Sequence, residues 1–331
     1  MKRIYKLTAA LLSCAMLAGA AGCTQYESGN EKVYTYEEAI KELNAFNDQI
    51  HTDTIKPRLD IYNSETAAKT LADIKTFPLT VEGSGSIDIE VAAATEMSSD
   101  APDDWLNIVA ENFNRSGAQL NGKTVSVTVR KITSGEVLTY MTESDYRPDV
   151  YAPSSEAWGQ MLSAKGINTI TLADRIAGNT AGVLMEKNTY GTFTEKYGEV
   201  TLANVLDASL AGDLTFAYTN PYTSSTGLNI LTGMLYAFDN ENPLSRTAQQ
   251  KLLDYQKQSP PVAYTTGVLR EQATKGIIKA MVMEEQAYHN TPELKNYVYT
   301  PEGIRHDHPL YTFDYVSKES RTRLSCSATS A

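Results

Sequence analysis

From Ile87 onward, short apolar segments alternate with segments that have helical periodicity, and this alternation most constrains the fold. The segment "IDIEVAAAT" is typical of a buried strand. In the next segment, "DDWLNIVAENFNRSG", apolar side chains recur every three or four residues and Gly117 marks the helix end. The segment "KTVSVTVRKI" then alternates polar and apolar residues, which predicts a second strand. This β-α-β order is typical of a mostly parallel sheet covered by helices, so we expect an α/β fold.

The same alternation extends almost to the end of the chain. Further helices are expected at "SGEVLTYMT", "SEAWGQMLSAKG", "VTLANVLDASLAG", "SRTAQQKLLDYQKQS" and "GVLREQATKG". Further strands are expected at "RPDVYAPSS", "AGVLME", "DLTFAYTN", "PVAYTT" and "IIKAMVMEEQAY", and "YVYTPEGIRHDHPLYTFDYV" should form two strands around a turn. Upstream, "TYEEAIKELNAFNDQI" predicts a helix in an N-terminal extension. The final segment "RTRLSCSATSA" is polar, and two hypotheses stay open: a truncated copy of a longer protein, or a disordered tail.

Composition limits the partners and the stabilising chemistry. The chain has 331 residues, enough for two lobes, and a net charge of -11, which argues against nucleic acid or another polyanion as partner. Of its three cysteines, Cys14 lies in an apolar N-terminal run and Cys326 lies in the tail. Removal of the N-terminal run and lipidation of Cys23 would leave Cys326 without a partner, so we expect no intramolecular disulfide.

The first residues indicate export. A basic start (Lys2, Arg3 and Lys6) precedes the apolar run "LTAALLSCAMLAGAA", which is too short to span a bilayer. The run ends at "AAGC", which resembles the lipobox of bacterial lipoproteins, with Ala20 where Leu is usual. This resemblance implies removal of residues 1–22 and lipidation of Cys23, and therefore a cell-membrane anchor on the extracytoplasmic face. The alternative is an ordinary secretory signal with a chance cysteine.

The loop "TNPYTSSTGLN" places several hydroxyl groups between a predicted strand and a predicted helix. The first turn of a helix has unpaired N–H groups at the positive end of its dipole, so such a loop can bind an anion or a carboxylate. No Lys occurs between Thr219 and Asn229, which excludes a P-loop. The simpler interpretation is that Thr223 or Ser225 caps the helix.

Two other loops have the same character. Ser154 and Ser155 follow a predicted strand in "YAPSSEAW", and Thr95 follows the first strand in "ATEMSSDAPDD". Ligands of open α/β sheets lie beyond the carboxyl ends of the strands, so all three loops are expected to face one crevice.

Together these features look like those of the bacterial extracellular solute-binding proteins of ABC importers. The resemblance is to the type II fold, which includes the molybdate, sulfate, phosphate and iron binders, and it rests on the lipobox, "TNPYTSSTG", "AMVMEEQAY" and "VYTPEGIRHDHPLYTF". In that family a Pro-x-Thr-Ser-x-Ser-Gly-like loop lines the cleft. Residues Pro221, Thr223, Ser224, Thr226 and Gly227 match this loop.

One departure from the family pattern concerns the ligand. Glu284 and Glu285 stand where Tyr and a small residue are common, and two acids oppose a small oxyanion. The ligand could instead be cationic, metal-linked or peptide-like.

The resemblance implies a two-lobed α/β fold of the type II periplasmic-binding-protein kind, each lobe a mostly parallel sheet flanked by helices. The expected divisions are a signal peptide (1–22), a tether and helical extension (23–84), lobe 1 (85–184 and 306–331) and lobe 2 (185–305). Ligand contacts are expected from Thr95, Ser134, Ser154, Ser155, Thr223, Ser224, Ser225, Thr226, Tyr264 and Glu285.

The implied function is capture of a small solute by hinge closure and its delivery to an ABC permease, with no cofactor and no catalysis. The alternative is a surface interaction lipoprotein. Some lipoproteins of this kind carry a von Willebrand factor A domain, and a truncated chain would lack it. A secreted enzyme is a third hypothesis, but Gly-x-Ser-x-Gly and Ser-x-x-Lys motifs do not occur, and Cys326 is a poor nucleophile.

Metal binding is not expected. His306 and His308 flank Asp307 and would share a face of a strand, but two His with no third ligand are more typical of solvated turn residues. The acids of "DAPDD" lack the spacing of an EF-hand loop and suit a helix start.

Overall fold

The computed structural model describes Thr35, Glu38, Lys41 and residues 71–316. The predicted signal peptide, lipidation site, tether and C-terminal tail lie outside these residues. Of the helix expected between Thr35 and Ile50, Glu38 and Lys41 are described as helical. The described residues 71–316 belong to one compact unit.

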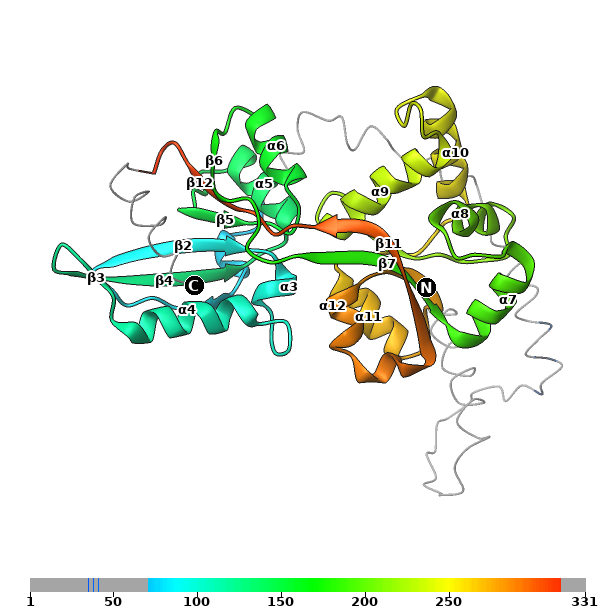
Figure 1. Ribbon diagram of the computed structural model, residues 1–331, viewed down its shortest axis with the longest axis horizontal. Coiled ribbons are helices and arrows are strands. Elements are labelled where there is room, and N and C mark those ends of the chain that lie inside the picture. The colour runs from blue at the N-terminus through cyan, green and yellow to red at the C-terminus, as the bar shows by residue number, and fades with distance from the viewer. Residues whose placement is uncertain (1–34, 36–37, 39–40, 42–70, 317–331) are drawn as a thin grey trace, which may run out of the picture. The chain divides into compact units, whose positions relative to one another are not determined.

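The first lobe is built on a mixed, seven-stranded sheet with the order β1-β4-β2-β5-β12-β6, in which β3 also pairs with β4 (Figure 1). Only β2 runs parallel to its neighbours β4 and β5; the other pairs are antiparallel. The strands are β1 (Leu79–Val81), β2 (Ile87–Ala93), β3 (Gln119–Leu120), β4 (Lys123–Lys131), β5 (Val150–Ala152), β6 (Thr169–Ala173) and β12 (Leu310–Phe313).

Helices cover both faces of this sheet (Figure 1). Successive residues of β2 point to opposite faces, so Val91 packs with Ala110 of α4 while Ala92 packs with Trp158 of α6. Helix α4 ends at Gly117, whose φ of 63° is the left-handed conformation that glycine adopts most readily. The helical segments are η2 (Ile74–Thr76), α3 (Thr95–Ser98), α4 (Trp105–Ser116), α5 (Ser134–Glu143) and α6 (Ala157–Ala164).

The second lobe has a three-stranded sheet with the order β10-β7-β11 and a two-stranded sheet formed by β8 and β9. An isolated parallel bridge between Ala217 and Met281 links these two sheets. The strands are β7 (Asn179–Glu186), β8 (Tyr218–Thr219), β9 (Val262–Ala263), β10 (Ala280–Glu284) and β11 (Tyr297–His306). The helical segments are α7 (Lys187–Tyr197), α8 (Leu202–Leu210), α9 (Ser225–Phe238), α10 (Arg246–Lys257), α11 (Thr266–Thr274), α12 (Glu285–His289) and η3 (Pro292–Asn296).

The predicted fold class is confirmed, but the sheets are less parallel than expected. In the three-stranded sheet both pairings are antiparallel. The reason lies in the connection between the lobes. Strand β7 carries the chain into the second lobe and its neighbour β11 carries it back (Figure 1), so the two must run in opposite directions.

The segment expected to form two strands around a turn does form two strands, but they do not pair with each other. Strand β11 belongs to the second lobe and β12 lies between β5 and β6 of the first. Strand β1 pairs with β4 although it precedes the expected boundary at residue 84, and the boundary expected at 184/185 falls within β7.

Candidate functional site

A cavity of about 210 Å³ lies between the two lobes, at the carboxyl ends of β2 and β10. It is smaller than the roughly 300–1,000 Å³ pockets that hold drug-sized ligands, so it suits a small solute. Five of the ten predicted ligand contacts line it: Thr95, Ser134, Thr223, Ser224 and Ser225. The other lining residues are Glu96, Ser99, Asp103, Lys131, Thr133, Asn179, Thr265, Thr266, Gly267, Arg270, Glu284, Gln286 and Ala287.

In the hydroxyl-rich loop of residues 219–229, one hydroxyl caps a helix and another contacts the other lobe. Ser224 is the N-cap of α9, as its side chain accepts a hydrogen bond from the backbone N–H of Gly227. The Ser225 hydroxyl donates to the Ser134 hydroxyl of the first lobe at 3.1 Å and accepts from Trp158 Nε1 at 2.9 Å. A single hydroxyl does cap the helix, but it belongs to Ser224 and not to Thr223 or Ser225, which were the expected caps. The Ser225 hydroxyl joins the lobes instead.

Two further predicted contacts also join the lobes and do not line the cavity. The Ser155 hydroxyl donates to the side-chain oxygen of Asn229 in α9 at 3.2 Å. The phenol of Tyr264, which is half exposed, donates to the carboxylate of Glu136 in α5.

The remaining three predicted contacts support or flank the cavity. Ser154 is fully buried and its hydroxyl donates to the carboxylate of Glu96. Thr226 likewise donates to Glu284. Glu285 does not line the cavity: its side chain is 47% exposed and accepts a hydrogen bond from Thr180 at 2.9 Å. The hydroxyls of Ser154 and Thr226 therefore do not line the cavity themselves but orient carboxylates that do.

The lobes also meet through backbone and charged groups. The N–H of Gly135, at the start of α5, donates to the carbonyl of Thr223 at 2.9 Å. Arg270 of α11 forms an ion pair with Asp103 of the first lobe at 2.6 Å, and the Asp103 side chain is 8% exposed. The structure is therefore a closed arrangement of the two lobes.

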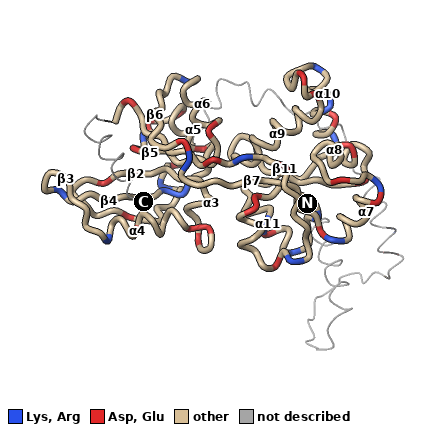
Figure 2. The backbone as a smooth tube through the Cα atoms, viewed as in Figure 1, with Lys and Arg blue, Asp and Glu red and all other residues tan. Residues whose placement is uncertain are grey.

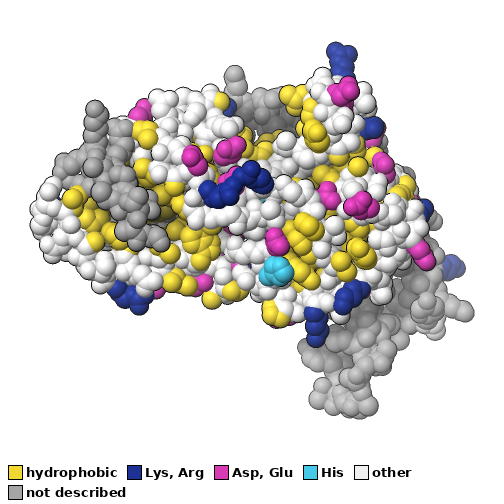
Figure 3. Space-filling model, in the orientation of Figure 1, with side chains coloured by type: hydrophobic (Ala, Val, Ile, Leu, Met, Phe, Trp, Pro, Cys, Tyr) yellow, Lys and Arg dark blue, Asp and Glu magenta, His cyan; other side chains and the backbone are white. Residues whose placement is uncertain are grey.

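Both signs of charge occur in both lobes (Figure 2), and on the face shown in Figure 3 basic and acidic side chains are interspersed.

Sequence reasoning missed most of the charged groups in the cavity: Glu96, Asp103, Arg270 and Lys131. Glu96 directly follows the predicted contact Thr95, so the rule that ligands lie at strand ends could have found it. Arg270 and Lys131 occur in ordinary amphipathic segments, and nothing in their spacing distinguishes them.

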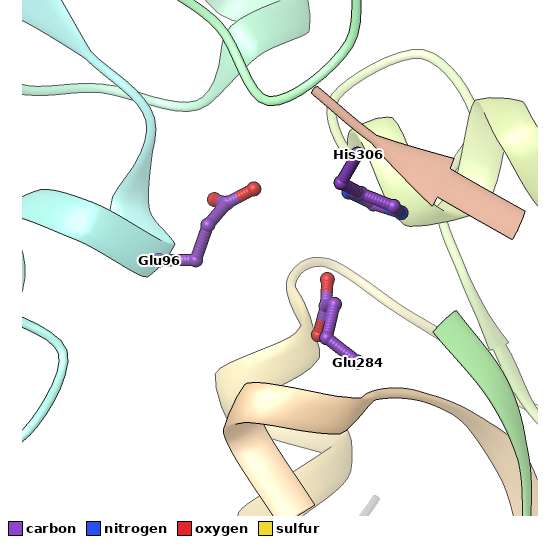
Figure 4. A group of neighbouring side chains, drawn as sticks. All are labelled: Glu96, Glu284 and His306. Carbon is purple, nitrogen blue, oxygen red and sulfur yellow. The ribbon is translucent and has the colours of Figure 1, made fainter. Parts of the chain in front are cut away.

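Three side chains from separate elements converge at the cavity (Figure 4). Glu96 comes from α3, Glu284 ends β10 and His306 ends β11, and one ligand-type atom of each lies within 4.8 Å of the others. One carboxylate oxygen of Glu284 accepts from the Thr266 hydroxyl at 2.9 Å. The other oxygen and both ring nitrogens of His306 are buried without a hydrogen-bond partner among the described residues.

The expectation that His306 and His308 are solvated turn residues is wrong. Both are buried, with exposed fractions of 0% and 1%. The chain passes here from one lobe to the other, so packing on both sides covers the two rings. His308 Nδ1 lies 3.1 Å from the carbonyl oxygen of His306.

Burial shifts the protonation of the cluster. Burial, together with the nearby charge of Glu284, raises the pKa of Glu96 to about 8. Burial also raises the pKa of Glu284, although hydrogen bonds from Thr226 and Thr266 oppose this. The pKa of His306 is lowered to about 4 because burial disfavours the imidazolium. At neutral pH, Glu96 is therefore protonated and His306 is neutral.

In chelator-treated protein, Glu96→Gln should stabilise the fold more at about pH 8 than at about pH 5. The raised pKa means that folded Glu96 keeps a proton which the unfolded chain releases. The contribution of this proton to stability is fully present below pH 4.5 and is lost as the pH rises toward about 8. Gln does not titrate, so the difference in unfolding free energy should widen by roughly 1–3 kcal/mol. Urea unfolding at both pH values measures it, and an equal difference at both would contradict the shift.

A family model for bacterial extracellular solute-binding proteins matches residues 90–323, which is more than two thirds of the chain. The chain belongs to the bacterial extracellular solute-binding proteins. This family is one of binding proteins, in agreement with the expectation that the chain is not an enzyme. No curated protein sequence shows significant similarity to this one.

Solved structures support the fold of this solute-binding protein. A periplasmic thiamin-binding protein is similar with a TM-score of 0.52, 14% identity and coverage of 76% of this chain and 81% of that one. The sulfate-binding protein SubI from Mycobacterium tuberculosis H37Rv is similar with a TM-score of 0.51 and 13% identity, and the match covers 73% of this chain and 81% of that one. Iron-bound HitA from Pseudomonas aeruginosa is similar with a TM-score of 0.51 and 14% identity, and the match covers 73% of this chain and 80% of that one. At these identities the likeness shows the fold alone.

The described part of the solute-binding protein contains no helix with both the length and the hydropathy needed to cross a bilayer.

Proposed function

We propose that this chain is a lipid-anchored receptor on the extracytoplasmic face of the cell membrane, which binds a small solute between its lobes and delivers it to an ABC permease. The observation that carries the proposal is the shared cavity. Glu96 of the first lobe and Glu284 of the second both line it, so one small ligand could contact both lobes. A ligand that contacts both lobes stabilises their closed arrangement.

Membership of the solute-binding family supports binding, and the solutes named for the similar structures are sulfate, thiamin and iron. The five lining residues predicted from sequence, Thr95, Ser134, Thr223, Ser224 and Ser225, remain proposed contacts. The AAGC motif supports the membrane anchor, because it predicts lipidation of Cys23. The variant Cys23→Ser, which cannot be lipidated, should not be anchored to membranes through a lipid.

A thermal-shift screen of the full chain against oxyanions, divalent cations, sugars, thiamin-like cations and short peptides tests solute binding. A ligand that binds only the folded state raises the apparent stability by mass action, by about 2.7 kcal/mol at 100 times its Kd. We expect at least one class to raise the melting temperature in a saturable manner. If no class does so, the chain would fit a surface interaction protein instead of a transport receptor.

A further inference from the structure

The cluster of Glu96, Glu284 and His306 has the chemistry of a metal site and spans both lobes. The side chains come from α3, β10 and β11, respectively, and offer two carboxylate oxygens and one imidazole nitrogen within 4.8 Å of one another (Figure 4). Ligand atoms around one ion, at bonds of about 2.0–2.2 Å, lie at most about 4.4 Å apart. Small rotations of the side chains would therefore bring all three atoms onto one ion.

The buried atoms of the cluster lack partners, which is the independent sign of a ligand. Buried polar atoms are almost always hydrogen-bonded. Glu284 is 2% exposed and His306 is fully buried, yet one oxygen of Glu284 and both nitrogens of His306 have no partner among the described residues. A cation bound between them would satisfy the free oxygen and one of the nitrogens.

Neighbouring groups already orient the two carboxylates. The hydroxyl of Ser154 donates to Glu96, and those of Thr226 and Thr266 donate to one oxygen of Glu284. Such hydrogen bonds fix the direction of a metal ligand and leave its other lone pairs for the ion. Hydroxyl groups that sequence analysis assigned to the ligand itself would then act by holding the carboxylates that bind it.

We infer that Glu96, Glu284 and His306 bind a divalent first-row transition cation, which is the solute of this receptor or its charged centre. This inference rests on the proposed solute-binding function and names the chemical class of the ligand. The imidazole nitrogen favours Zn(II), Mn(II) or Fe(II) over Mg(II) and Ca(II), which prefer oxygen ligands alone. When an ion binds, Glu96 releases its proton to solvent, and the two carboxylates then neutralise the charge of the ion. The side of the cluster that faces the cavity leaves room for water or a small co-ligand.

The site also explains how a solute would hold the lobes together. Glu96 belongs to the first lobe, Glu284 to the second, and His306 ends one of the two strands that connect them. Opening the lobes would separate Glu96 from the other two ligands. Cation affinity and lobe closure are therefore coupled.

Isothermal titration of the chelator-treated full chain with ZnCl₂ and with MnCl₂ tests the inference, with MgCl₂ and CaCl₂ as comparison ions. Mn(II), which binds thiolates weakly, controls for the three cysteines. We expect one high-affinity site for Zn(II) and Mn(II), and affinities at least about 100-fold weaker for Mg(II) and Ca(II).

The variants Glu96→Gln, Glu284→Gln and His306→Gln should each weaken Mn(II) binding by about 100-fold or more. Glu285→Gln is the matched control, because this neighbouring acid is 47% exposed and lies outside the cluster; its affinity should stay within about threefold of the unmodified chain. Glu96→Gln keeps the test decisive if the buried variants fail to fold, because Glu96 is only partly buried.

Two results would overturn the inference: no binding of either transition cation to the folded chain, or binding that survives Glu96→Gln. If transition cations fail while another class in the thermal-shift screen binds, the cation assignment falls and solute binding stands. If nothing binds, both fall.

Discussion

Gly135→Ala is expected to weaken solute binding by at least about 100-fold, close to 3 kcal/mol. Gly135 lies in the first turn of α5, where its N–H reaches Thr223 of the other lobe. A Cβ here would collide with the carbonyl oxygen of Tyr222 and lie 2.8 Å from Thr223 Cα. Both obstacles are backbone atoms of the second lobe, so the variant can relieve the clash by holding the lobes apart.

The same substitution should leave each lobe folded, because Ala is a better helix former than Gly by about 1 kcal/mol. Gly191→Ala in α7 is the matched control, since a Cβ there would meet nothing within 4 Å. Isothermal titration with the compound that most raises the melting temperature measures the loss. Equal affinities for the Gly135 and Gly191 variants would contradict the role assigned to this contact.

Gly182→Ala is expected to destabilise the fold itself, by roughly 3 kcal/mol, which corresponds to about 6–12 °C in melting temperature. Gly182 lies in β7 and pairs with both Met283 and Pro301. A Cβ would collide with the carbonyl oxygen of Thr300 and lie 2.9 Å from Pro301 Cα. Unlike the contact at Gly135, this one lies within a single sheet, so lobe opening cannot relieve it.

The control for Gly182 lies in the same connecting segment. At Gly178 the nearest atoms to an added Cβ belong to the side chain of Arg175, at 3.8 Å, so Gly178→Ala should change the unfolding free energy by less than about 0.5 kcal/mol. Calorimetry or urea unfolding of both variants provides the comparison. A Gly182 variant as stable as the Gly178 variant would show that the sheet adjusts to the added methyl group.

The fold could be predicted from the sequence because its elements are locally encoded. The strand over Ile87–Ala93 and the helix ended by Gly117 follow from alternation and a glycine cap. The pairing of β12 between β5 and β6 could not be predicted, because "IRHDHPLYTF" reads locally as a hairpin. The two strands of this segment belong to different sheets because the chain crosses from the second lobe to the first between them.

The site was less predictable, for a physical reason. Hydroxyl groups at helix starts are visible in sequence, but whether they contact a ligand or the other lobe depends on how the lobes meet. Ser225 contacts Ser134, and Ser155 contacts Asn229, across the two lobes. The burial of His306 has the same origin, because packing of both lobes around the connecting strand removes it from solvent.

A small solute is proposed to close the two lobes over one cavity. Pulsed electron spin resonance tests it most directly, with spin labels at Glu111→Cys in α4 and Thr274→Cys in α11, both exposed positions in different lobes, and with the native cysteines replaced by Ser. Saturation with the compound that most raises the melting temperature should shift the distribution of distances between the labels toward the shorter, closed arrangement. The shift should be absent when Gly135→Ala is added. A distribution that is identical with and without the bound compound in the otherwise unmodified chain would contradict closure on a solute.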